Sequence, residues 1–314
     1  MATTRDGYLS QTVAFFAVFA CPGSFPMSST LKAALWMIGA IASFTSMAVA
    51  GREVSFALDT FEIMMYRSFV GVIIVVTLIS VTRSWAQVTT RSMGVQMLRN
   101  AAHFTGQNLW FYAVTVIPLA QVFALEFTSP LWVIVLSPLI LGERLTLTRV
   151  VAALIGFSGI LIVARPGAEE INLGVITAAS AAIFFAITIT VTKRLTRTES
   201  IACILFWLTV MQAVLGVVFV AWDGDIALPD ATTAPWLILI GIAGLLAHYC
   251  MTNALAIAPA TVVVPIDFVR LPTIAVIGML LYAEPLDLWV FVGALVIFAG
   301  NYLNIWSETK RAKA

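Results

Sequence analysis

The chain contains ten apolar runs, each about 20 residues long, and the connections between them are too short to form a separate domain. A helix that crosses the hydrocarbon core of a bilayer needs about 20 predominantly apolar residues. The sequence therefore predicts an all-α integral membrane protein with ten transmembrane helices, whose work is done inside the bilayer. The runs cover approximately residues 31–50, 60–81, 96–116, 118–141, 146–164, 172–192, 200–222, 234–256, 259–282 and 286–306.

The composition excludes a soluble protein. Hydrophobic residues make up 61% of the chain and charged residues 11%, against about 45–50% and about 25% in average globular domains. This excess cannot be buried in one water-soluble core, so it must face lipid. The net charge of +1 leaves no basic surface for nucleic acid. The three cysteines, Cys21, Cys203 and Cys250, form no CxxC motif, and we expect no disulfide, no metal site and no cofactor.

The positive charges predict the orientation in the membrane. Cytoplasmic loops of membrane proteins are enriched in Lys and Arg. With the N-terminus inside, thirteen of the 17 basic residues lie on the cytoplasmic side, two lie outside and two lie within spans. We therefore expect both termini in the cytoplasm. The cytoplasmic group is Arg5, Lys32, Arg83, Arg91, Arg99, Arg144, Arg149, Lys193, Arg194, Arg197, Lys310, Arg311 and Lys313.

Residues 1–27 do not fit this scheme. Their apolar stretch, 13–21, has nine residues and is too short to span a bilayer. A signal-peptide core is one alternative, because Val18–Cys21 faintly resembles a lipoprotein cleavage box. We instead expect an unstructured N-terminal extension, with Met27 as the natural start.

The second half of the chain repeats the first. At an offset of 141 residues, His103–Ile160 aligns without a gap to Gly244–Asn301. Each repeat holds five helices, in residues 28–166 and in residues 167–314 with its basic tail. Because five is odd, the second copy must be inverted, and inverted repeats place the substrate site near the midplane between the halves. Matched pairs include Pro118 with Pro259, Glu126 with Asp267, Glu143 with Glu284 and Gly159 with Gly300.

These features carry a family resemblance. They are two sets of five helices, Arg67 in the second helix, a Pro-containing turn into helices four and nine, and the Gly142-Glu143 and Ala283-Glu284 corners that follow those helices. Over residues 28–306 the chain resembles the drug/metabolite transporter superfamily, EamA-domain type. The resemblance implies export of amino acids, other small metabolites or drugs across a bacterial inner membrane. Within the superfamily the chain is most similar to aromatic amino acid exporters. One departure is that Leu208 stands where the second copy would repeat Arg67.

Candidate substrate-binding residues are polar or aromatic positions within spans. His103, Gln107 and Trp110 lie on one face of the third helix. The repeat places His248 opposite Gln107, so the two can converge from different halves. An imidazole and an amide together offer donors and acceptors for a zwitterion. Further candidates on helices one and six are Trp36, Ser43, Phe184 and Thr188. The alternative for all of them is packing and hydrogen bonding between helices.

Four ionisable residues within spans are candidates for coupling or gating: Arg67, Glu126, Asp267 and Arg270. Asp267 and Arg270 are three residues apart and can form a structural ion pair. Glu126 has no basic residue within a turn of its own helix. If protons are coupled to transport, Glu126 is the first candidate; the alternative is a tertiary pair with Arg67 or Arg99.

Prolines suggest where the molecule bends. Pro130 and Pro272 are predicted to lie inside helices four and nine, where an internal proline frees backbone groups and allows bending. We expect these two helices to move as gates.

The sequence favours a secondary transporter that works by alternating access around a central cavity, exporting aromatic or other hydrophobic amino acids. Its expected partners are the bilayer, a small-molecule substrate and protons if transport is coupled, and we expect a monomer. A nucleotide-like or vitamin metabolite is the alternative substrate. No GxxxxGK[ST] motif is present, so this chain has no ATP site of that type.

An intramembrane enzyme is the competing class. Gly156-Phe157-Ser158-Gly159 and His248 are the components of a rhomboid-like serine protease. The repeat argues against it, because Ser158 aligns with Ala299 and the segment then resembles a small-residue packing surface. We expect the chain not to be an enzyme.

Overall fold

The computed structural model describes residues 29–141, 147–164, 172–195, 198–224, 226–257, 266–267 and 269–313. Each of the ten predicted runs contains helix within these residues, which confirms the all-α class. The expectations for residues 1–27, Glu143 and Pro259 lie outside the described residues. The helices are α2 (Ser29–Val54), α3 (Thr60–Val81), α4 (Met93–Val116), α5 (Leu119–Glu126), α6 (Ser129–Leu141), α7 (Leu147–Ala164), α8 (Leu173–Leu195), α9 (Ile201–Asp223), α10 (Ala234–Ile257), α12 (Arg270–Tyr282) and α13 (Leu288–Lys313), with a 3-10 turn η1 at Trp85–Gln87.

The predicted fourth helix is two helices. It starts at Pro118 as expected, but α5 ends at Glu126 and α6 begins at Ser129. Hydroxyl groups satisfy the freed carbonyls: Thr128 donates to Leu125 at 2.7 Å and Ser129 to Glu126 at 2.6 Å. Asn301 of α13 donates to the Phe127 carbonyl at 3.2 Å. A broken helix is tolerated at membrane depth only where such partners replace the lost backbone bonds.

Pro130 and Pro272 each lie in the first turn of a helix rather than in a helix interior, which corrects the prediction for both. Pro130 is the second residue of α6 and Pro272 the third residue of α12. In the first turn of a helix the N–H groups have no intrahelical acceptor, so proline costs no hydrogen bond there. Val269, a turn residue before α12, aligns with Thr128 at the offset of 141. The discontinuity therefore occurs at the same place in both halves.

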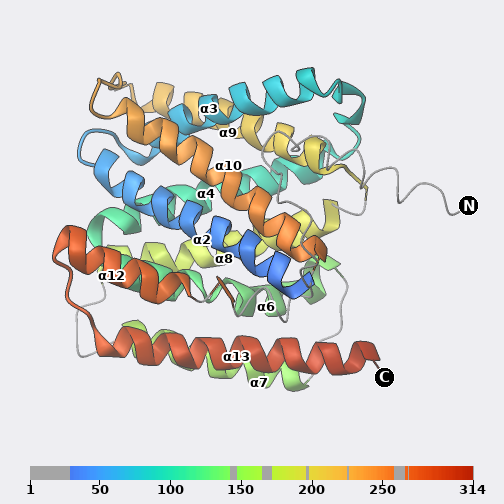
Figure 1. Cartoon of the computed structure of the whole chain (residues 1–314), viewed down its shortest axis with the longest axis vertical. Helices are drawn as coiled ribbons and strands as arrows, with labels where there is room; N and C mark the ends of the chain where they lie inside the picture. The colour runs from blue at the N-terminus through green and yellow to red at the C-terminus, as the bar shows by residue number, and fades with distance from the viewer. Residues whose placement is uncertain are drawn as a thin grey trace, which may run out of the picture.

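The helices pair across the two halves in a two-fold pattern (Figure 1). The most extensive contacts are α2 with α10, α4 with α8, α3 with α9, and α7 with α13. The inverted repeat equates α2 with α8 and α10 with α4, so the first two pairs are equivalent. The other two pairs each join a helix to its own counterpart. Figure 1 shows α3 and α9 along one side, α7 and α13 along the other, and the α2, α10, α4 and α8 layer between them.

The ends of the α3–α9 pair are tied to the opposite half in equivalent ways. Asp59 caps α3 by accepting from the N–H of Glu62 at 2.8 Å, and Glu62 accepts from the Ala227 N–H at 2.5 Å. Ser200, which aligns with Asp59, caps α9 by accepting from the Cys203 N–H at 3.1 Å. The Cys203 thiol in turn donates to the Thr89 carbonyl at 3.5 Å.

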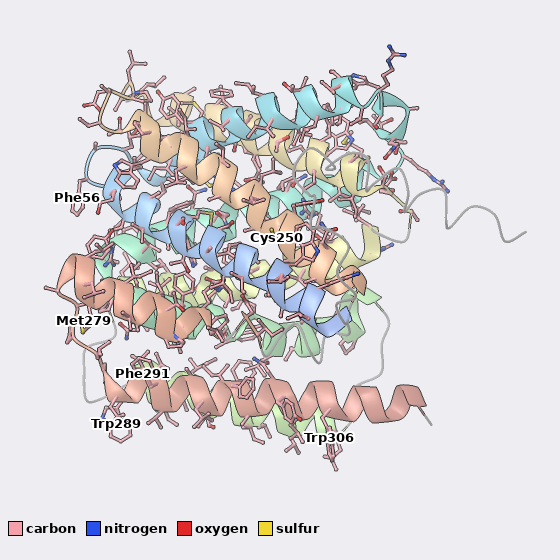
Figure 2. The ribbon with its side chains drawn as sticks, in the orientation of Figure 1. Phe56, Cys250, Met279, Trp289, Phe291 and Trp306 are labelled. Carbon is pink, nitrogen blue, oxygen red and sulfur yellow. The ribbon has the colours of Figure 1, made fainter. Side chains whose placement is uncertain are left out.

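The outer surface suits a bilayer. By length and composition, five helices of the described residues can span a membrane, α2, α3, α8, α9 and α10, and shorter apolar helices accompany them. Figure 2 shows Trp289 and Trp306 on the outward side of α13, where they are 52% and 47% exposed. Seventeen residues of helix separate them by about 25 Å, close to the thickness of about 30 Å of a hydrocarbon core. Both are placed as interfacial anchors should be.

Glycines let α7 and α13 approach closely. A Cβ at Gly159 would lie 2.7 Å from the Gly293 carbonyl oxygen, and one at Gly300 would lie 2.6 Å from the Ala152 carbonyl oxygen. Both obstacles are backbone, which cannot move aside as a flexible side chain can. The repeated Gly159 and Gly300 therefore fix this helix pair.

We predict that Gly159→Ala destabilises the protein by about 1 to 3 kcal/mol, the usual cost of overpacking. The control is Gly94→Ala in the first turn of α4, where a Cβ meets nothing within 4 Å. Thermal unfolding in detergent should show a lower midpoint for the first variant and an equal or higher one for the second, because Ala favours helix. Equal midpoints for Gly159→Ala and the unmodified protein would show that α7 and α13 do not pack this way.

Candidate functional site

Helix α4 carries a line of buried polar side chains through the centre of the bundle. Arg99, His103, Gln107 and Trp110 are 5%, 3%, 6% and 2% exposed. Their spacing of four, four and three residues keeps them on one face. They make α4 less apolar than its neighbours, and α4 is absent from the five helices that qualify as spans by composition. Polar groups at membrane depth are costly, so such a line is a candidate functional face.

Arg67 of α3 reaches this face. Its Nη1 donates to Gln107 Oε1 at 2.5 Å, and its guanidinium lies 5.9 Å from the centre of the Phe111 ring. Gly244 of α10 leaves space for it, because a Cβ there would lie 3.3 Å from Nη2 of Arg67. The structure thus brings the predicted residues Arg67 and Gln107 together.

Two histidines from opposite halves face each other at this centre. The ring centres of His103 and His248 are 6.0 Å apart. Phe185 of α8 lies 6.3 Å from His103, and Phe44 of α2 lies 5.6 Å from His248. Both ring nitrogens of His103 are buried without a hydrogen-bond partner among the described residues. An imidazole in this state can donate at one nitrogen and accept at the other.

A second cluster adjoins the first and changes the interpretation of Glu126. Its Oε2 accepts from Trp110 Nε1 at 2.8 Å, and its Oε1 accepts from Arg270 Nη2 at 3.2 Å. Arg270 also bonds Asp267 at 3.0 Å, as the spacing predicted. The partner of Glu126 is therefore Arg270 of the other half, and the alternative pair with Arg67 or Arg99 is wrong. The Arg270 guanidinium lies 4.8 to 5.0 Å from the ring centres of Phe44, Phe123 and Phe127.

The remaining candidates lie around this centre. Trp36 packs edge-on against Tyr249 at 5.5 Å, at the α2–α10 interface. Ser43 is buried on α2 beside Phe44. Thr188 donates to the carbonyl of Phe184 at 2.9 Å, so its hydroxyl is satisfied within α8. The Phe184 Cβ lies 3.1 Å from where a Cβ of Gly106 would stand, against α4.

Three residues of this centre were not predicted from the sequence: Phe44, Phe185, and Arg99, which was counted among the cytoplasmic charges but is buried on α4. Arg99 precedes His103 by four residues and shares its face. Phe44 and Phe185 align at the offset of 141, and each contacts one of the two histidines. Both signals were in the sequence, but their meaning depends on which helices pair.

The site has neither a protease pair nor a metal centre among the described residues. Ser158 donates to the carbonyl of Ile155 at 2.7 Å on an exposed face of α7. No three His, Cys, Asp or Glu side chains of the described ranges converge as a metal site requires. The chemistry available at the centre is recognition by hydrogen bonds, charge and aromatic contact.

The centre is closed in this structure. One cavity of about 360 Å³ lies at the bundle end that carries the exposed Phe56, between residues such as Phe61, Tyr112 and Trp222. Another, of about 350 Å³, lies between α2, α10 and α12 and is lined by Thr45, Trp236 and neighbours. Both are lined by residues outside the polar centre. Because His103 and Gln107 are only 3% and 6% exposed, a ligand reaches them only when helices part.

An ion pair ties the two halves together at the Phe56 end. Arg52 pairs with Glu284, and its other nitrogens donate to the carbonyls of Val114 at 2.6 Å and Ile117 at 2.5 Å. The second oxygen of Glu284 accepts from the Leu119 N–H at 2.9 Å, at the start of α5. The connection from α4 to α5 is thus held by α2 on one side and by the α12–α13 turn on the other.

Comparison with known proteins decides the family. The model of the EamA-like transporter family matches residues 31–165 and again residues 172–306. The chain belongs to the EamA-like transporter family. This confirms the predicted resemblance, and with its apolar helices it makes the chain a multi-pass protein of the bacterial inner membrane.

The relatives of this EamA-like transporter carry names for two kinds of substrate. It is 27% identical to a riboflavin transporter of Vibrio cholerae over 90% of this chain and 96% of that one. It is 34% identical to a riboflavin transporter of Brucella anthropi over 68% and 77%. It is 25% identical to an S-adenosylmethionine uptake transporter of Rickettsia bellii over 88% and 94%. These relatives do not support the expected amino acid substrate. One crystal structure, 16% identical, superposes with a TM-score of 0.61 over 90% of this chain and 99% of that chain and supports the fold.

We predict that Arg52→Gln and Glu284→Gln each destabilise the transporter, because each leaves the other buried charge unpaired. Breaking a buried pair typically costs about 3 to 5 kcal/mol. The double variant should lose less free energy of unfolding than the two single variants lose together. A double-mutant cycle on unfolding in detergent measures this difference.

The control for this cycle is Arg91→Gln on the exposed connection before α4. An exposed charge contributes little to stability, so the unfolding midpoint of Arg91→Gln should equal that of the unmodified protein. Strict additivity of Arg52→Gln and Glu284→Gln would contradict the pairing.

Proposed function

We propose that this EamA-like transporter moves a planar heteroaromatic metabolite of the vitamin or nucleotide-like class. The observation that supports it best is the buried pair of His103 and His248 with a phenylalanine on each. The imidazoles and the Gln107 amide match the mixed donors and acceptors at the edge of such a ring, while Phe44 and Phe185 match its face. The names of the relatives agree with this class.

The charge arrangement disfavours the α-amino acid that the sequence first suggested. A zwitterion needs a carboxylate for its ammonium group. The two central carboxylates, Glu126 and Asp267, are both bonded to Arg270. Releasing one would leave a buried charge unpaired, which is costly. A ring with neutral polar edges needs no such release.

The fold supplies a route for alternating access. The α2–α10 and α4–α8 interfaces are equivalent, and the polar centre lies between them. Opening either interface exposes His103 and His248 to one side of the membrane. The breaks before α6 and α12 give each half a place to bend, and at the first of them side chains bond to backbone carbonyls.

Uptake into liposomes tests the substrate class. Purified protein should take up labelled riboflavin saturably, and an unlabelled heteroaromatic compound should compete better than phenylalanine or threonine. His103→Ala should reduce uptake at least tenfold, because it removes the central donor and acceptor. Thr115→Ala, at the exposed end of α4, is the control. Saturable phenylalanine uptake that riboflavin does not inhibit would reject the proposal.

We further predict that Pro130→Ala and Pro272→Ala slow turnover more than they weaken binding. Alanine allows the preceding residues to join the helix, which stiffens the break without touching the centre. The maximal uptake rate should fall several-fold while half-saturation stays nearly constant. Unchanged maximal uptake rates in both variants would show that the helix breaks take no part in the transport cycle.

A further inference from the structure

The buried arginines of this transporter fall into two groups. Arg52 and Arg270 each have a carboxylate partner, Glu284 for the first and Glu126 with Asp267 for the second. Arg67 and Arg99 have none within the described residues. Arg99 Nε donates to the Thr192 hydroxyl at 2.6 Å and its Nη1 to Asn100 Oδ1 at 3.1 Å. Every oxygen that these two guanidinium groups contact is neutral.

The two unpaired arginines lie on either side of the same histidine. Arg99 is one helical turn before His103 on α4, and Arg67 bonds Gln107, one turn after it. Arg67 also approaches Gly244, one turn before His248 on α10. The polar centre is therefore bordered by two positive charges that the described residues leave uncompensated.

Charge at membrane depth makes this arrangement informative. Arginine stays protonated in proteins, so these groups cannot escape the cost of burial by losing a proton. Such residues normally pair with an opposite charge or line a ligand pathway. Both nitrogens of His103, between the two arginines on this face, lack a hydrogen-bond partner among the described residues, and no carboxylate of these residues pairs with either arginine. A ligand is the partner that would complete the site.

We propose that Arg67 and Arg99 recognise an oxyanion, a phosphate or a carboxylate, carried by the planar substrate. The inference rests on the proposed function and narrows its substrate class. A guanidinium binds both oxyanions with paired, charge-assisted hydrogen bonds. The ring lies between Phe44 and Phe185, its polar edge meets His103 and Gln107, and the oxyanion meets the guanidinium groups.

Equilibrium binding to the purified protein tests this with two matched pairs of compounds. Riboflavin and flavin mononucleotide differ by a phosphate, and nicotinamide and nicotinate differ by a carboxylate. At least one anionic member should bind tenfold or more tightly than its neutral partner, and the pair that shows this identifies the oxyanion. Arg99→Gln should reduce that ratio to within threefold, with Arg99→Lys restoring part of it because the positive charge returns.

The control is Arg91→Gln, which removes an exposed positive charge and should keep the ratio. Arg99→Gln protein must remain monodisperse and helical, since otherwise Arg67→Gln replaces it in the same assay. Equal affinities within both pairs would overturn the oxyanion proposal and leave the heteroaromatic class standing. A third outcome is that inorganic phosphate or acetate binds, that Arg99→Gln abolishes this binding, and that no ring compound binds. This outcome would support the oxyanion site and reject the heteroaromatic substrate class. Folded protein that binds none of these probes would overturn both.

Discussion

A charge inside a bilayer must meet a partner, and this requirement organises the whole molecule. Arg52 meets Glu284 at the Phe56 end, and Arg270 meets Glu126 and Asp267 near the centre. The Arg52–Glu284 and Arg270–Glu126 pairs join residues from opposite halves, so these charges also hold the halves together. Arg67 and Arg99 meet only neutral groups of the described residues. The same rule that explains the scaffold therefore separates structural charges from those available to a ligand.

The backbone obeys a parallel rule. In a membrane every N–H and C=O must be satisfied within the protein, yet α5 and α6 are separated by a break. Thr128, Ser129 and Asn301 supply the hydrogen bonds that the break removes. Side-chain bonds of this kind can be exchanged more easily than a continuous helical ladder. The break is stable enough to be buried and still remains the place where the fourth span can change direction.

Much of this fold could be predicted from the sequence, because the period of 141 residues and the length of the apolar runs are properties of the chain itself. The start of α3 at Thr60 and of α10 at Ala234 agree with the runs. The Glu126–Arg270 pair could not be predicted, since 144 residues separate the partners and several cations were available. Pro130 illustrates the same limit: proline indicates that a helix is interrupted, but not whether it kinks the helix or begins the next one.

The two-fold pattern also distinguishes two kinds of position: those that are the same in both halves and those that differ between the halves. Positions that pack or bend are repeated: Gly159 with Gly300, and the breaks before α6 and α12. Three polar positions at the centre are not: His103 aligns with Gly244, Gln107 with His248, and Arg67 with Leu208. Rocking between two equivalent states needs equivalent halves, so substitutions at the first positions are constrained in pairs. A metabolite has no such symmetry, and a site that fits one must differ between the halves. We therefore expect the asymmetric residues of this symmetric scaffold to determine which substrate is transported.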